Sequence, residues 1–252
     1  AYEISTRDWS SDVCSSDLKN MGSKLENKLE IVFYSGAELL EGPCWDNQNQ
    51  IIYCVSIKQN LIYRINPLSG EIVTYKTNGN VGCAVIDINN MIISAEKKGI
   101  YKINPITKER IFLSHPENDI TVRYNDGKLD PIGRFIVGTK SEDESKFGKG
   151  KLFSYFNNTY KVLLTGVSIS NGIGFSQKGD TMYYIDTPTK KIAQYKYDLK
   201  TGDIVFEKYI IEIDGPGYPD GMCVDKDDNV WVAEWDGGRV RKWDRSEEHT
   251  SE

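Results

Sequence analysis

The sequence predicts an all-β protein, and three observations support this fold class. Short runs of β-branched and aromatic residues recur along the chain, separated by turns rich in Gly, Asn, Asp and Pro. The runs form units that repeat every ~40–50 residues, a period typical of propeller blades. No long stretch has the apolar periodicity of a helix. The repeated order of the units favours a β-propeller over a β-sandwich, which also alternates strands and turns.

Five such units follow one another along the chain. In order, their β-rich runs lie at 51–55, 61–65 and 71–75; 91–94, 99–103 and 110–113; 134–138, 151–155 and 160–164; 181–185, 192–197 and 204–206; and 229–233 and 239–243. The first two units share the sequence Tyr-basic-Ile-Asn-Pro, which begins at Tyr63 and Tyr101. We therefore expect successive four-stranded antiparallel blades, the last of them incomplete.

Both ends of the chain are predicted to lie outside the folded domain. One DNA segment, read in opposite orientations, can encode both 245–252 and 11–18, and it resembles a sequencing-library adapter. Residues 1–18 and 245–252 are therefore interpreted as artefacts, which leaves a C-terminally truncated propeller at 19–244. The alternative is a pair of acidic, serine-rich disordered tails. In either case, we expect no apolar core between the tails and the propeller.

Composition excludes several classes of function. The tails hold two basic and seven acidic residues, so the other 226 residues have a formal net charge of −1 instead of −6. A near-neutral domain gives no reason to expect nucleic acid or an anionic membrane as a partner, and no long apolar span or signal peptide is visible. Apart from Cys14 in the N-terminal tail, the chain has four cysteines without a C-x-x-C pair (Cys44, Cys54, Cys83 and Cys223), which predict buried free thiols and a cytoplasmic location.

Three short motifs each place an oxygen-bearing side chain beside a Gly or Gly-Pro turn. They are Glu41-Gly-Pro, Ser170-Asn171-Gly172 and Pro219-Asp220-Gly221. Each precedes a β-rich run, so the loops at one end of a propeller channel can bring the motifs together. Their oxygen atoms suit a hard divalent cation. The alternative for each motif alone is an ordinary turn, because Asn-Gly and Asp-Gly are common turn signals.

The densest polar stretch, 123–134, has two interpretations. It lacks the helices and the final glutamate of an EF-hand, which excludes that motif. It forms either a tight turn with a charged rim or a substrate clamp in which Arg123 and Asn125 bind hydroxyl or carbonyl oxygens. No Gly-x-Ser-x-Gly elbow and no Gly-rich phosphate loop are present, so triad hydrolases and nucleotide-binding proteins are disfavoured.

Taken together, the motifs resemble the senescence-marker-protein/gluconolactonase family, the regucalcin-like proteins. The similarity extends over about 30–244 and keeps the family's motif order. It is carried by Glu41-Gly-Pro-Cys-Trp45, the stretch 123–134, Ile169-Ser-Asn-Gly172, Pro219-Asp-Gly-Met-Cys-Val-Asp225 and Gly237-Gly-Arg-Val240. The resemblance implies a six-bladed propeller, here with its last blade missing or incomplete.

The resemblance also implies a site and an activity. One divalent metal ion would be held by Glu41, Asn171 and Asp220, with Ca²⁺ expected first and Zn²⁺, Mg²⁺ or Mn²⁺ as alternatives. Arg123 and Asn125 would contact the substrate. An acidic contact after Gly138-Thr139 is assigned to Glu142, and the register leaves Asp143 open as an alternative.

The implied reaction is the opening of a sugar lactone. The metal would polarise the carbonyl group, and Asp220 would activate water. The alternative is a non-enzymatic propeller that binds calcium or a protein partner. The sequence does not predict which lactone is used or the oligomeric state.

Overall fold

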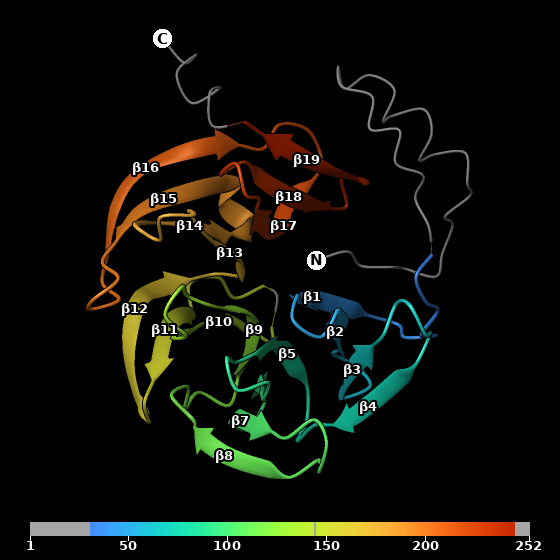
Figure 1. Cartoon of the computed structure of the whole chain (residues 1–252). Coiled ribbons are helices and arrows are strands. Elements are labelled where there is room, and N and C mark those ends of the chain that lie inside the picture. The colour runs from blue at the N-terminus through green and yellow to red at the C-terminus, as the bar shows by residue number, and fades with distance from the viewer. Residues whose placement is uncertain (1–30, 144, 245–252) are drawn as a thin grey trace.

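The computed structural model describes residues 31–143 and 145–244, and this part of the chain is all-β, which confirms the predicted class. Its strands form five antiparallel sheets that follow one another around a common axis (Figure 1). The one helical element among these residues is a short 3-10 turn, η2 (Thr187–Thr189). No helix in the described ranges has the length and apolar character needed to cross a membrane.

Each sheet is a blade in which every strand pairs with the next one along the chain. Blade 1 contains β1 (Leu40–Asp46), β2 (Ile51–Ser56), β3 (Leu61–Ile65) and β4 (Ile72–Lys76). Blade 2 contains β5 (Val81–Ile86), β6 (Ile92–Glu96), β7 (Gly99–Ile103) and β8 (Arg110–Ser114). Blade 3 contains β9 (Val122–Leu129), β10 (Phe135–Ser141), β11 (Gly150–Phe156) and β12 (Thr159–Val167). Blade 4 contains β13 (Ser170–Phe175), β14 (Thr181–Asp186), β15 (Lys191–Tyr197) and β16 (Ile204–Glu212), and blade 5 contains β17 (Tyr218–Val224), β18 (Val230–Trp235) and β19 (Arg239–Trp243).

The prediction of successive antiparallel blades is therefore confirmed. Four blades have four strands, and the fifth has three strands within the described residues. The six-bladed ring is not shown, because the described residues form five blades. The expected artefacts at 1–18 and 245–252 lie outside the described residues, so that expectation stays a prediction.

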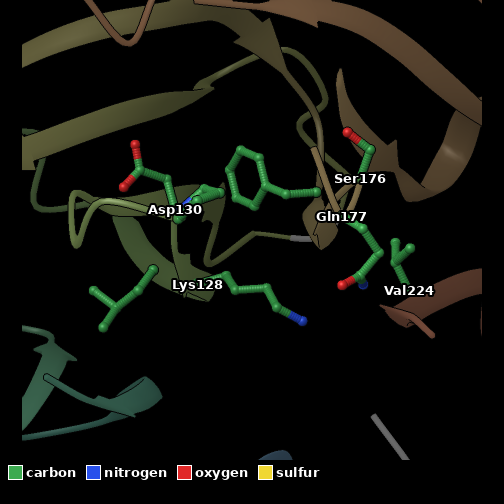
Figure 2. Close-up of a pocket in the computed structure, with 8 residues that line it drawn as sticks. Lys128, Asp130, Ser176, Gln177 and Val224 are labelled. Carbon is green, nitrogen blue, oxygen red and sulfur yellow. The ribbon is translucent and has the colours of Figure 1, made fainter. Parts of the chain in front are cut away.

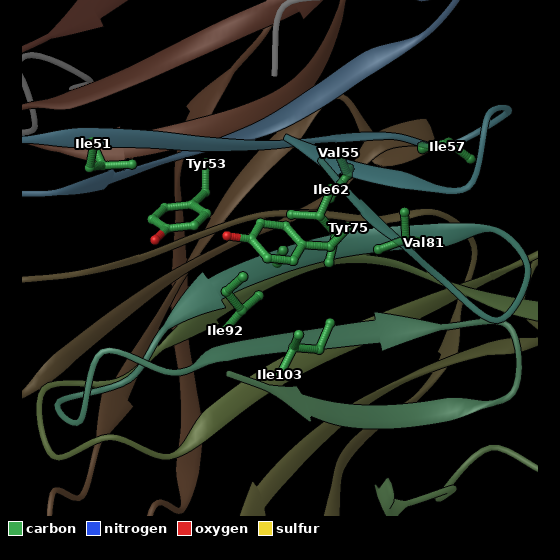
Figure 3. Close-up of a cluster of buried hydrophobic side chains, with 10 residues drawn as sticks. Ile51, Tyr53, Val55, Ile57, Ile62, Tyr75, Val81, Ile92 and Ile103 are labelled. Atoms are coloured by element: carbon green, nitrogen blue, oxygen red, sulfur yellow. The ribbon is translucent and has the colours of Figure 1, made fainter. Parts of the chain in front are cut away.

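The hydrophobic core lies between neighbouring blades. In the cluster of Figure 3, Tyr53 and Tyr75 of blade 1 pack with Val81, Ile92 and Ile103 of blade 2. Similar clusters fill the spaces between the following blades. Since both faces of a middle strand meet a neighbouring blade, strands such as β6 and β10 are buried along their whole length.

The first strand of each blade lies nearest the axis and was missing from the predicted β-rich runs. We expected the three motifs in turns, but Glu41, Asn171 and Asp220 lie inside β1, β13 and β17. These strands are rich in Gly, Pro, Asn and Asp, which are depleted in ordinary strands. Glycine is needed here because adjacent inner strands approach closely: a Cβ atom on Gly82 would lie 2.4 Å from the carbonyl oxygen of Tyr124.

The second half of the polar stretch 123–134 joins blades 3 and 4. Asp130 accepts hydrogen bonds from the Arg134 guanidinium at 2.8 Å and from the Tyr197 hydroxyl at 2.6 Å. Arg134 also donates to the carbonyl oxygen of Leu199 at 3.0 Å. Asp130 and Arg134 are both buried, so this half of the stretch is a structural clasp.

The prediction for the cysteines is correct in part. All four thiols are free, and Cys54 and Cys83 are buried. Cys44 is partly buried, whereas Cys223 is exposed, so the expectation of burial was wrong for Cys223. Successive residues of a strand point to opposite faces. Because Met222 and Val224, the neighbours of Cys223, lie on the side of β17 that packs on the core, Cys223 points to the other side.

Candidate functional site

A β-bulge interrupts the first strand of every blade at an equivalent place. The pairing register shifts just after Glu41 in β1, just after Asn171 in β13, and across Asp220 in β17. In β9 the shift spans Asn125 and its neighbour Asp126, which both lie opposite Gly138 of β10. Bulges turn side chains away from the regular pleat and are common beside active sites. The inner strands of blades 1, 3, 4 and 5 thus present polar side chains at one end of the ring.

Blade 2 is the exception in this arrangement. Its register shifts at Gly82, which has no side chain to present. The backbone of Gly82 instead packs against the main chain of Tyr124 and Asn125. Blade 2 therefore supports the polar bulge of blade 3 without adding a polar side chain of its own at this position.

Hydrogen bonds connect the predicted site residues of blades 3 and 4. An Arg123 guanidinium nitrogen donates to Asn125 Oδ1 at 2.9 Å. Asn125 Nδ2 donates to Asn171 Oδ1 at 2.9 Å and to the carbonyl oxygen of Ser170 at 2.8 Å. Asn125 and Asn171 are only 6% and 7% exposed. Three residues that the sequence singled out are therefore neighbours in space.

The same chain of hydrogen bonds continues into blade 5. Asn171 Nδ2 donates to Thr187 Oγ1 at 2.8 Å, and Thr187 Oγ1 donates to the carbonyl oxygen of Pro219 at 2.8 Å. Pro219 directly precedes Asp220, which is 8% exposed. Blade 4 is thus tied to the segment that carries Asp220.

Electrostatics bring Glu41 of blade 1 into the same region. Crowding of its carboxyl group by protein atoms raises the pKa of Glu41 to about 7, and the nearby negative charge of Asp220 adds to this effect. The positive charge of Arg123 acts in the opposite direction, and Asp126 raises this pKa further. Glu41, Asp220 and Arg123 therefore share one electrostatic environment although they lie on three different blades.

The chemistry of these side chains fits a hard divalent cation. The Glu41 and Asp220 carboxylates repel each other, and a bound cation would relieve this repulsion. Asn171 Oδ1 accepts one hydrogen bond and keeps a second lone pair. Within the described residues, no three His, Cys, Asp or Glu side chains are grouped as a metal site. The candidate set differs because its third member is an asparagine.

Glu142 lies apart from this network. Its carboxylate pairs with Lys97 of blade 2 at 2.6 Å and is 42% exposed. Asp143, the alternative, is exposed and accepts hydrogen bonds from the Ser145 hydroxyl and the Lys146 ammonium group, which lower the pKa of Asp143 to about 2. Glu142 and Asp143 are thus each engaged in contacts of their own, and the assignment of Glu142 as a substrate contact stays a prediction.

Sequence reasoning missed two residues of the site. Asp126 lies in the same bulge as Asn125, and burial raises the pKa of its carboxyl group while a hydrogen bond from the Gly127 amide lowers it. The sequence held a signal for Asp126, because Asp126 is followed by a glycine just as Glu41 and Asp220 are. Thr187 carried no such signal, because only the fold places its hydroxyl between Asn171 and Pro219.

A cavity of about 270 Å³ lies elsewhere, at the other end of the inner strands (Figure 2). It is lined by the last residues of β9, β13 and β17 and by residues that follow β9 and β13, among them Lys128, Ser176, Gln177 and Val224. The candidate residues lie near the beginnings of the same strands. A strand rises ~3.3 Å per residue, so the two places are separated by most of a strand length. The cavity is distinct from the candidate site.

One known protein family matches most of this chain. The family model for the SMP-30/gluconolactonase/LRE-like region matches residues 39–252. A putative sugar lactone lactonase, YvrE, from Bacillus subtilis is 32% identical over 204 residues, which cover 79% of this chain and 69% of that protein. Regucalcin from Danio rerio is 28% identical over 220 residues, 86% of this chain and 75% of that protein.

A solved structure supports the fold. The calcium-binding protein regucalcin from Agrobacterium tumefaciens superposes with a TM-score of 0.80 at 23% identity. The match covers 85% of this chain and 74% of that protein. At this level of identity the similarity establishes the architecture alone.

Proposed function

This chain belongs to the SMP-30/gluconolactonase/LRE-like family, and from this we propose that it is a hydrolase that opens sugar lactones with the help of one divalent metal ion. The observation that carries the proposal is the hydrogen bond from Asn125 to Asn171. It joins a group suited to a polar substrate to a group suited to a hard cation. The lactonase name of the Bacillus subtilis relative supports the reaction type.

We assign Glu41, Asn171 and Asp220 as the protein ligands of the ion. A donor set made of carboxylate and amide oxygens supports Ca²⁺ as the first choice, with Zn²⁺, Mg²⁺ and Mn²⁺ as alternatives. When bound, the ion supplies Lewis acidity to a carbonyl oxygen and acidity to a water molecule.

Asp220 is assigned as the general base. Its carboxylate takes a proton from water as the water oxygen bonds to the lactone carbonyl carbon. The ring C–O bond then breaks, and the proton passes to the departing ring oxygen, so that a hydroxy acid is formed. The neighbouring Glu41 carboxylate supports this role, because nearby negative charge strengthens a base.

Arg123 and Asn125 are assigned to the substrate. Arg123 can only donate hydrogen bonds, which suits hydroxyl and carbonyl oxygens. Both Nδ2 protons of Asn125 are used within the protein, so Asn125 Oδ1 has one remaining lone pair for a substrate hydroxyl group. Glu142 would accept a hydrogen bond at the rim. Free thiols at all four cysteines of the described range support the cytoplasm as location.

The experiment measures hydrolysis of a panel of sugar lactones, detected by the acid that the reaction releases. The protein is first treated with a chelator, and each metal is then added back separately. We expect activity in the parent and none in Asp220→Ala, which loses a ligand and the base together. Asn125→Ala should mainly raise KM and lower kcat through poorer substrate orientation. If Asp220→Ala is as fast as the parent at saturating metal, the mechanism is wrong. If the parent opens no lactone but binds Ca²⁺ tightly, the lactonase proposal is wrong and the non-enzymatic calcium-binding function takes its place.

A further inference from the structure

Thr187 lies between the candidate metal ligand Asn171 and the segment that carries the candidate ligand Asp220. It is the first residue of η2, follows the end of β14, and is 8% exposed. Its hydroxyl group accepts a hydrogen bond from Asn171 Nδ2 and donates one to the Pro219 carbonyl oxygen, both at 2.8 Å. It therefore touches Asn171 directly and holds the residue before Asp220.

The direction of these hydrogen bonds follows from proton counting. A carbonyl oxygen can only accept, so the single hydroxyl proton of Thr187 must go to Pro219. Thr187 Oγ1 then has only lone pairs to offer Asn171, and the Asn171 amide must turn its NH₂ group toward it. An amide flipped by 180° would place Asn171 Oδ1 against a hydroxyl oxygen that has no proton left.

The other end of the chain of hydrogen bonds imposes the same direction. Arg123 can only donate, so Asn125 must present Oδ1 to it and Nδ2 to Asn171. Asn171 then accepts at Oδ1 on this side and donates at Nδ2 on the Thr187 side. All four hydrogen bonds, from Arg123 to Pro219, run one way, because neither end can reverse.

We propose that Thr187 is a positioning residue that keeps Asn171 Oδ1 directed at the divalent ion and couples it to the segment carrying Asp220. This inference rests on the metal site of the proposed function. Without the Thr187 hydroxyl, the hydrogen bond from Asn125 Nδ2 is the remaining one of the two contacts that distinguish the two orientations of the Asn171 amide, so the correct orientation is held less firmly. One of these orientations presents an NH₂ group, which a cation repels. Thr187 thus acts on metal affinity through Asn171 without touching the ion.

The test is calorimetric titration of Ca²⁺ into the chelator-treated full chain. Thr187→Val keeps the shape of the side chain and removes the hydroxyl group, and we expect its Ca²⁺ affinity to fall about 10–100-fold. Thr187→Ser restores a hydroxyl group and should bind close to the parent. The matched control is Thr189→Val in the same short helix, whose hydroxyl donates only to the Asp186 carbonyl oxygen at 2.7 Å and accepts from the Lys191 amide. It should bind Ca²⁺ as the parent does.

Two results would overturn the inference. The first is that Thr187→Val binds Ca²⁺ as tightly as the parent. The second is that Thr189→Val weakens Ca²⁺ binding as much as Thr187→Val does, which would indicate a general loosening of η2. Thermal unfolding in chelator separates a misfolded variant from a folded one, and Thr187→Ser keeps the comparison valid if Thr187→Val unfolds.

Failure of the proposed function would look different. If the parent binds Ca²⁺, Thr187→Val weakens binding, and no variant opens a lactone, then the lactonase proposal fails while the positioning role stands. If the parent binds none of Ca²⁺, Mg²⁺, Mn²⁺ and Zn²⁺, the positioning role fails, and hydrolysis measured in chelator decides the enzymatic proposal by itself.

Discussion

Gly172 packs directly against the main chain of Asp220. A Cβ atom on Gly172 would lie 2.8 Å from the Asp220 carbonyl oxygen, closer than such atoms approach in proteins. This contact joins the inner strands of blades 4 and 5 at the level of two candidate ligands, Asn171 and Asp220. The glycine of the Ser-Asn-Gly motif therefore belongs to the packing of strand on strand and not to a turn.

The first prediction follows from this contact. Gly172→Ala should lower the free energy of unfolding by about 1–3 kcal/mol, because the added methyl group overpacks the interface against backbone. It should also weaken Ca²⁺ binding by moving Asp220 away from Asn171. Gly174→Ala, two residues along in β13, is the control, since the three atoms nearest to its Cβ would all be side-chain atoms of Val224 and Met222. Urea unfolding and Ca²⁺ titration check this, and equal effects of the two variants would contradict it.

The second prediction concerns the carboxylates. In chelator, Glu41→Gln should be at least as stable as the parent, because it removes a desolvated charge beside Asp220. With Ca²⁺ at 100 times its Kd, the parent should gain about 2.7 kcal/mol of stability, and the variant should gain less. Thermal unfolding with and without Ca²⁺ measures both.

A nearby glutamate provides the control for this experiment. Glu38 lies on the same segment, is exposed and pairs with Lys58. Glu38→Gln should keep the full stabilisation by Ca²⁺. A full stabilisation of Glu41→Gln would exclude Glu41 as a ligand.

The third prediction separates the structural clasp from the site. Asp130→Asn leaves the buried Arg134 guanidinium without its counter-charge, which should cost about 3–5 kcal/mol in the free energy of unfolding. Asp203→Asn removes an exposed ion pair with Lys161 and should change stability little. Ca²⁺ affinity of folded Asp130→Asn should equal that of the parent. If Asp130→Asn is as stable as Asp203→Asn, the clasp contributes little to the free energy of unfolding.

The fourth prediction is a pH dependence in the hairpin between β17 and β18. Burial acts to raise the pKa of Asp225, but hydrogen bonds from Trp231 Nε1 and from Asn229 prevail and lower it below its usual 3.8. A lowered folded-state pKa contributes stability above pH ~3.8 that is lost as the pH falls further. The parent should therefore exceed Asp225→Asn in stability at pH 7, and the difference should shrink in acid.

Urea unfolding across this pH range tests the fourth prediction. Asp227→Asn is the control, because Asp227 is exposed in the same hairpin and its side chain pairs only with the exposed Lys226. A difference between the parent and Asp225→Asn that stays constant with pH would contradict the assigned role of the Asp225 carboxylate.

Local sequence was sufficient for the middle and outer strands. Runs such as 61–65 and 99–103 coincide with β3 and β7, because β-branched and aromatic residues suit a pleated, half-buried surface wherever they occur. The inner strands could not be predicted in this way. The residues of β13 and β17 resemble turns in isolation, and they form strands because neighbouring strands pair with them. In β13, glycines also permit close packing.

By itself, the sequence determined the all-β repeat and the polar residues of the segments around Glu41, Asn125, Asn171 and Asp220, because both are properties of short segments. It therefore identified Arg123, Asn125 and Asn171, which hydrogen bonds connect in the folded protein. Only the tertiary structure decided that Thr187 bridges Asn171 and Pro219, and that Glu41 and Asp220 share one electrostatic environment. These relations join different blades, and they exist because interblade packing brings together segments that are far apart along the chain.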